Sequence, residues 1–206
     1  MSDVSPDDGS VATEVTVGFF GKIPSRGDFV RAGLPGSFIT GWDSWLQDML
    51  PASRLALGAH WLPAWLEAPI WLFMLQAGAC GPNAAMGVFM PSVDRAGRHF
   101  PLTLACVAPN AATLALRINW LAVAEAAGIA ALEADLDPEA IAERLRASPS
   151  AADTIATAPL GRCAWWTAGA PLVPATAFAT DALPDAAVFA RMLDAQATGG
   201  AAPLGR

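Results

Sequence analysis

Two short polar segments carry side chains suited to binding a charged group. One covers residues 22–28 and the other residues 92–98, and each combines cations with a hydroxyl and an acid. The candidate binding residues are Lys22, Ser25, Arg26, Asp28, Ser92, Asp94, Arg95 and Arg98. If both segments lie at one end of a sheet, four cations and two hydroxyls surround one spot. That spot would bind a phosphate or a partner's carboxylates, because arginine offers a planar pair of donors.

The same residues also have a structural interpretation. Arg26 and Arg95 would then pair with Asp28 and Asp94 and lock the two segments as ordinary turns. The residue types are compatible with both interpretations, so the sequence leaves the choice open.

The chain does not show the residue pattern of a catalytic site. Of its two histidines, His60 lies in an apolar stretch rich in tryptophan and His99 lies in a turn. No serine-hydrolase, zinc-protease or P-loop motif occurs. Asp28, Asp43 and Asp94 are interpreted as turn and cap residues rather than as paired catalytic acids. We therefore expect that the protein is not an enzyme.

The three cysteines predict neither a disulfide framework nor a metal site. Cys80, Cys106 and Cys163 are widely spaced and include no C-x-x-C pair. We expect no metal and no cofactor, and a reducing cytoplasm suits three unpaired thiols.

Composition and charge exclude several classes of protein. Apolar residues make up 54% of the 206 residues and charged residues 15%, which indicates a large buried core. The net charge of −7 does not suit nucleic acid or an anionic membrane. The acidic start MSDVSPDDGS is unlike a signal peptide, and the uncharged residues 68–93 are interrupted by prolines. We expect a cytoplasmic protein with no direct membrane insertion.

Short apolar runs bounded by glycine and proline predict strands. The expected strands cover residues 15–20, 70–76, 86–93, 100–107 and 163–167. Residues 21–36 are dense in glycine and proline and are expected to be a connection. Because the three middle strands follow one another through short turns, we expect them to form an antiparallel meander.

Helical spacing predicts an amphipathic helix that is capped by Ser37, buries Trp42 and Trp45, and ends at Pro51. Beyond residue 109 an alanine-rich stretch has Gly128 as a candidate break. Further helices are expected at residues 53–57, 110–136, 138–148 and 185–195.

This order of elements predicts a single α+β domain with a mainly antiparallel sheet flanked by helices. The domain is expected to cover residues 14–197, between a disordered N-terminal tail at 1–13 and a flexible C-terminal tail at 198–206.

Four sequence blocks carry a family resemblance. They are GFFGKIPSRGDFV at 18–30, WDSWLQ at 42–47, PSVDRAGRHFPLTLA at 91–105 and AWWTAG at 164–169. In this order they resemble the TagF family, accessory proteins of bacterial type VI secretion systems. His99 is a departure, because the resemblance leads us to expect an aromatic such as tyrosine there.

The resemblance implies a non-enzymatic cytoplasmic regulator. Such a protein represses the secretion machine after translation, through protein–protein interaction with a scaffold such as the forkhead-associated protein Fha. The resemblance assigns no role to a single residue, so the eight polar residues stay candidates. The alternative is an anion- or phosphopeptide-binding sensor that uses the two arginine-bearing turns.

Overall fold

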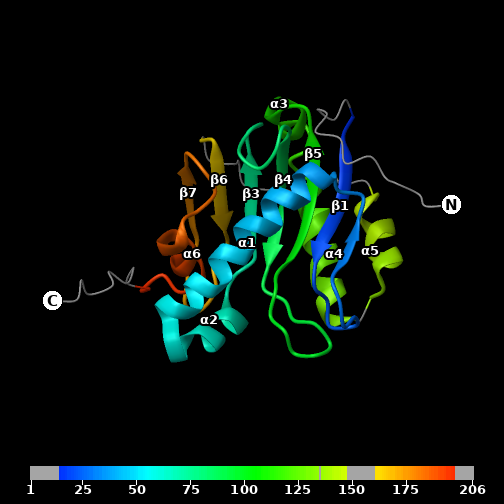
Figure 1. The fold of residues 1–206 in the computed structure, drawn as a ribbon. Helices are drawn as coiled ribbons and strands as arrows, with labels where there is room; N and C mark the ends of the chain where they lie inside the picture. Colours follow the sequence, from blue (N-terminus) through cyan, green and yellow to red (C-terminus); the bar gives the residue numbers. More distant parts are fainter. Residues whose placement is uncertain (1–13, 135, 148–160, 198–206) are drawn as a thin grey trace.

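The structure is a computed structural model that describes residues 14–134, 136–147 and 161–197. Within these residues seven strands form one sheet in the order β2-β1-β5-β4-β3-β6-β7, and every neighbouring pair is antiparallel (Figure 1). The strands are β1 (Thr16–Gly21), β2 (Val30–Ala32), β3 (Trp71–Leu75), β4 (Ala84–Met90), β5 (Leu102–Ala108), β6 (Cys163–Thr167) and β7 (Thr176–Thr180). The predicted meander is confirmed as β3-β4-β5, and the α+β fold is confirmed with it.

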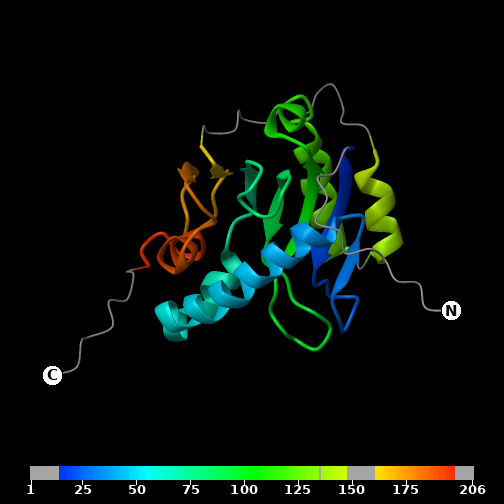
Figure 2. The same ribbon diagram turned by 45° about the horizontal axis from the view of Figure 1, so that its top comes forward.

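Helices cover both faces of the sheet (Figures 1 and 2). One face carries α1 (Gly36–Leu57), α2 (Trp61–Glu67) and α6 (Ala186–Leu193), with the short 3-10 helix η1 (Gly58–His60) between the first two. The other face carries α3 (Ala111–Ala115), α4 (Trp120–Glu133) and α5 (Pro138–Leu145). The central strands are buried on both faces, which explains their continuous apolar sequence.

Tryptophan dominates the core under α1. Trp42 is fully buried and packs near Trp45, Phe73 and Trp165. The indole N–H of Trp42 donates to the Thr103 hydroxyl at 2.9 Å. The sequence placed Trp42 and Trp45 on the buried face of this helix, and the structure confirms it.

The ends of α1 differ from those predicted. The helix begins after Pro35, which provides no side-chain cap, and Ser37 lies inside its first turn. It also continues through Pro51 to Leu57, so the predicted separate patch at 53–57 is its last part. Proline lacks the N–H that would bond the carbonyl of Gln47. Pro51 is exposed, however, and the buried residues before and after it hold the helix on the sheet.

Two strands were not predicted as strands. β2 lies within the expected connection at 21–36, and β7 follows β6, which corresponds to the last of the five expected strands. The predicted helix 110–136 is two helices that separate after Ala115, not at Gly128. Gly128 instead lies where α4 meets the sheet, because an added Cβ there would approach Met90 Cε to 2.3 Å.

The described residues fill most of the predicted domain, whereas the predicted tails at 1–13 and 198–206 lie outside them. Among the described helices, none is long and apolar enough to cross a bilayer.

Candidate functional site

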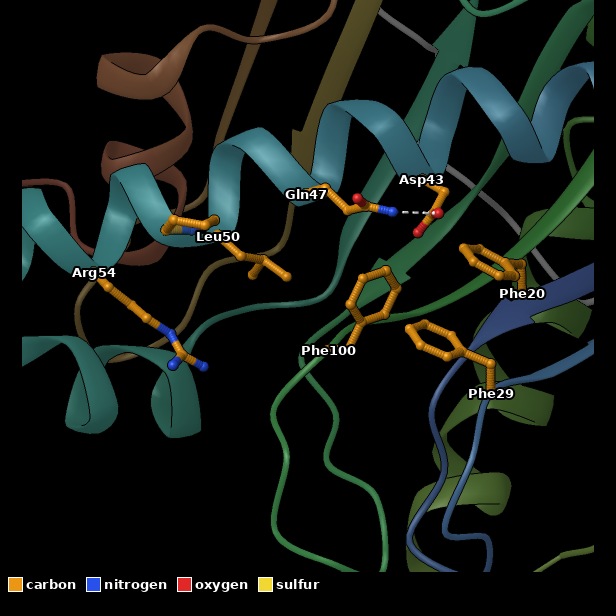
Figure 3. Close-up of a pocket in the computed structure, with 8 residues that line it drawn as sticks. Phe20, Phe29, Asp43, Gln47, Leu50, Arg54 and Phe100 are labelled. Carbon is orange, nitrogen blue, oxygen red and sulfur yellow. Dashed lines mark hydrogen bonds between the residues drawn. The ribbon is translucent and has the colours of Figure 1, made fainter.

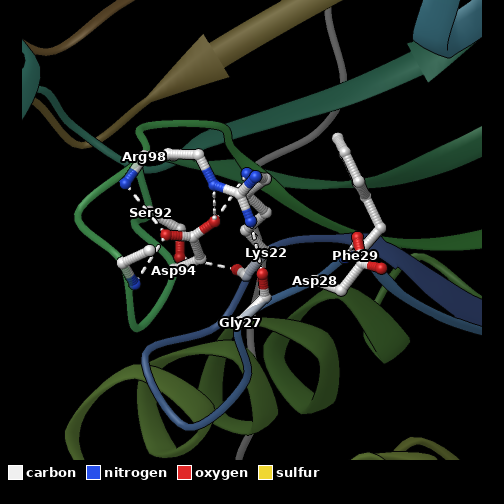
Figure 4. A network of polar contacts seen from close by, with 8 residues as sticks. Lys22, Gly27, Asp28, Phe29, Ser92, Asp94 and Arg98 are labelled. Atoms are coloured by element: carbon white, nitrogen blue, oxygen red, sulfur yellow. Dashed lines mark hydrogen bonds and ion pairs between the residues drawn. The ribbon is translucent and has the colours of Figure 1, made fainter.

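The two polar segments meet around one buried carboxylate (Figure 4). Asp94 Oδ2 lies 2.7 Å from Lys22 Nζ and 2.7 Å from Arg98 Nε. The side chain of Asp94 is 0% exposed and that of Lys22 is 7% exposed, whereas that of Arg98 is 60% exposed. Asp94 Oδ1 accepts from the backbone N–H groups of Ala96 and Arg98 at 2.9 Å each. One carboxylate thus closes the second turn and neutralises a lysine from the first.

These contacts explain the acidity of Asp94. Burial alone would raise its pKa, but the hydrogen bonds from Lys22, Arg98 and Ala96 outweigh burial and hold the pKa well below its usual range. The carboxylate is therefore ionised at neutral pH, and its bonds to both cations are charge-assisted.

Further hydrogen bonds join the segments. Ser92 Oγ donates to the Lys22 carbonyl at 2.6 Å, and the Arg95 N–H donates to the Arg26 carbonyl at 2.9 Å. The Arg98 guanidinium also donates to the carbonyl of Gly27. Ser25 Oγ instead donates to the Leu136 carbonyl at 3.1 Å. Both predicted hydroxyls are thus used internally.

Ion pairs do hold the two turns together, but the predicted pairing of the residues was wrong. Lys22 and Arg98 bind Asp94, while Asp28 is exposed and accepts from the Phe29 N–H at 2.8 Å. Neither Arg26 nor Arg95 forms an ion pair with another described residue, and both are exposed. The Arg95 guanidinium lies close to Gly27. Ion-pair partners depend on positions in space, which spacing along the chain does not give.

A pocket of about 580 Å³ adjoins this cluster and was missed from the sequence (Figure 3). One wall is formed by three phenylalanines and the other by one side of α1. The lining residues are Phe20, Phe29, Asp43, Gln47, Leu50, Pro51, Arg54 and Phe100. The phenylalanine wall combines residues from three separate segments of the chain. The sequence does not show that these segments meet, so the pocket could not be predicted from it.

Phe29 connects the pocket with the polar turns. Its ring stacks on Phe20 at 5.5 Å and meets the edge of Phe100 at 4.7 Å between centroids. Lys22 Nζ lies 5.0 Å from the centroid of the same ring. Phe29 is nevertheless 44% exposed. A large aromatic side chain is thus held firmly by its neighbours and still presented to solvent.

Arg54 and Asp43 give the pocket a polar rim with opposite charges. The Arg54 guanidinium lies over the ring of Trp61 at 4.1 Å. Asp43 Oδ2 accepts from Gln47 Nε2 at 2.6 Å. The His99 ring meets the Trp61 ring edge-on at 5.5 Å between centroids, so His99 occupies a place that suits an aromatic ring.

Burial shifts the pKa values of two buried cysteines and of His99. Burial raises the pKa of Cys80 to about 12 and that of Cys106 to about 11, so both thiols stay protonated at neutral pH. Burial and the charge of Arg54 lower the pKa of His99. In the described part of the chain, no three metal-ligating side chains gather.

Comparisons with known proteins agree with this fold. A sequence model of the TagF N-terminal domain, described as type VI secretion system-associated, matches residues 18–148. The crystal structure of PA0076 from Pseudomonas aeruginosa PAO1 is similar, with a TM-score of 0.75 and 33% identity. That match covers 92% of this chain and 98% of the other. No curated protein matches the sequence.

Proposed function

Because the chain belongs to the TagF N-terminal domain family, which is associated with type VI secretion, we propose that it is a regulatory binding module of that system. It acts in the cytoplasm, represses the secretion machine after translation and binds a scaffold such as the forkhead-associated protein Fha. It catalyses no reaction itself. The protonated cysteines and the packing of His99 against tryptophan support a binding role over a catalytic one.

One observation carries the proposal: two exposed arginines that form no ion pair with another described residue lie on the polar turns, and the contact of Lys22 with Phe29 connects these turns with a largely apolar pocket. We name Arg26, Arg95, Phe29 and the other residues that line the pocket the turn-and-pocket surface. Exposed aromatic and arginine side chains are the residues that contribute most to binding at protein interfaces. The Asp94 contacts hold the turns rigid, so little ordering is needed on binding.

This surface fits a partner segment with acidic side chains beside an apolar one. The acidic groups would pair with Arg26 and Arg95, and the apolar side chain would enter the pocket next to Phe29. The alternative sensor function has weaker support, because Lys22 and Arg98 already share the Asp94 carboxylate and both hydroxyls are used.

The test is binding of purified Fha from the same secretion system, measured by biolayer interferometry. Arg26→Ala combined with Arg95→Ala is expected to weaken binding at least tenfold, since truncating one partner of a desolvated charge pair costs about 2–5 kcal/mol. The thermal melt should stay nearly unchanged, because neither side chain has an ion pair among the described residues. Phe29→Ala tests the apolar part and should weaken binding as well.

The matched control is Arg144→Ala combined with Arg191→Ala. These exposed arginines lie on α5 and α6, and the control removes the same charge away from the site. If test and control bind Fha equally well, the surface is wrongly assigned. If the test variant unfolds, Arg26 and Arg95 are structural.

A further inference from the structure

One edge of the sheet is open. Within the described residues β7 pairs with β6 alone and is the last strand of the sheet, so the backbone groups on its other side have no strand partner there (Figure 1). Thr176, Ala177 and Ala179 are exposed. Natural proteins usually protect such an edge, because it is a template for another strand.

The opposite edge shows this protection and β7 does not. β2 has only three residues, carries the exposed Arg31 at its centre and is contacted by α5. β7 has five residues and no charge, proline or glycine. The same sheet therefore blocks pairing at one edge and permits it at the other.

The sequence of β7 is self-complementary. Residues 176–180 read Thr-Ala-Phe-Ala-Thr in both directions. An antiparallel pair of two copies centred on Phe178 places Thr176 opposite Thr180, Ala177 opposite Ala179, and Phe178 opposite itself. A two-fold interface requires this kind of match, since each contact occurs twice. We propose that β7 pairs with β7 of a second copy, which joins the two sheets into one.

The side chains around β7 suit this pairing. Opposed threonines and opposed aromatics are favourable cross-strand pairs, and no like charges meet. A pocket of about 400 Å³ lies beside the strand, lined in part by Phe178, Trp71, Val188 and Met192. The Phe178 ring of the second copy would lie on the same face and partly cover this pocket. Pro174 limits the pairing at one end, because it has no N–H to donate.

The pairing is short, so the dimer should be weak. Interfaces that bury less than about 1,200 Å² in total are mostly transient. β7 lies at the far end of the strand order from β1 and β2, which flank the first polar turn, and it is separated by β3 and β6 from β4 and β5, which flank the second. A dimer through β7 therefore keeps both turn-and-pocket surfaces free and presents two binding sites at once.

The experiment compares three full-length proteins by analytical ultracentrifugation over rising concentration. Ala177→Lys with Ala179→Lys places lysine opposite lysine twice in the paired strands. Ala177→Lys with Ala179→Glu places lysine opposite glutamate twice. Both variants carry long side chains at the same two positions, so a folding defect would be shared and visible in their melts.

We expect the natural protein to dimerise reversibly, the double-lysine variant to dimerise at least tenfold more weakly than the lysine–glutamate variant, and the latter to stay dimeric. A natural protein that is monomeric up to about 1 mM overturns the proposal, because this concentration would populate even a weak dimer. Equal dimerisation of all three proteins also overturns it, since the contact would then lie on another surface.

Discussion

The buried carboxylate of Asp94 accepts hydrogen bonds from four donor groups, which belong to Lys22, Ala96 and Arg98. Two side-chain cations and two backbone N–H groups satisfy it, so its burial does not leave an uncompensated charge. The residue couples the turn before β2 to the turn before β5, and both turns depend on it.

Asp94→Asn should change how stability depends on pH. Because the folded-state pKa of Asp94 is lowered, its contribution is fully present above the unfolded pKa of about 3.9 and is lost as pH falls toward the folded value. The stability difference between the natural protein and the variant should be constant from about pH 8 to pH 5 and shrink below about pH 4. Urea denaturation at a series of pH values measures it. A loss that begins near neutral pH would contradict the assignment.

His99→Phe tests a second pH effect in a separate range. Burial and Arg54 lower the pKa of His99, so the neutral ring is favoured and its contribution to stability is lost as pH falls below the unfolded value of about 6.5. The phenylalanine variant should keep the edge-on contact with Trp61 and lose less stability between about pH 7 and pH 5. Thermal melts at both pH values decide this, and parallel losses in the two proteins would refute it.

At the scale of elements, α1 binds the core through tryptophan. Trp42→Ala should lower the free energy of unfolding by about 3–5 kcal/mol, because it removes a fully buried side chain and the hydrogen bond to Thr103. Leu66→Ala on α2 is the control and should change stability by no more than about 0.5 kcal/mol, since Leu66 is 68% exposed. Equal effects in chemical denaturation would show that Trp42 does not anchor the helix.

The contact of α4 with the sheet depends on Gly128. Gly128→Leu should destabilise the protein by about 1–3 kcal/mol, because Met90 and Leu104 fill the space where the new side chain would lie. Ala126→Leu adds a large side chain at an exposed position of the same helix and serves as control. Calorimetry compares the two, and an unchanged melt for Gly128→Leu would mean that α4 packs less closely.

At the scale of the whole molecule, the sheet separates two surfaces. The turn-and-pocket surface lies near β1 and β2, and the open edge lies at β7. Distant sites without shared partners usually contribute additively. Arg26→Ala with Arg95→Ala should therefore leave the ultracentrifugation profile of the natural protein unchanged. A shift in dimerisation would indicate that the two surfaces are coupled.

The sequence by itself determined the parts with strong local signals. Apolar runs between turn residues identified β1, β3, β4, β5 and β6, and helical spacing identified the buried face of α1. Asp137 caps α5 before Pro138, as this local pattern predicts. The polar residues of both turns were also found, because charged side chains are rare in this chain.

Only the tertiary structure decided the rest. β2 is too short for a pattern, and β7 alternates too weakly in polarity to be recognised as a strand. Packing on the sheet carries α1 through Pro51, since the local preference of proline is weaker than the burial on both sides of it. The partners of Asp94 and the wall of the pocket come from segments far apart in sequence, and only folding determines which of them meet.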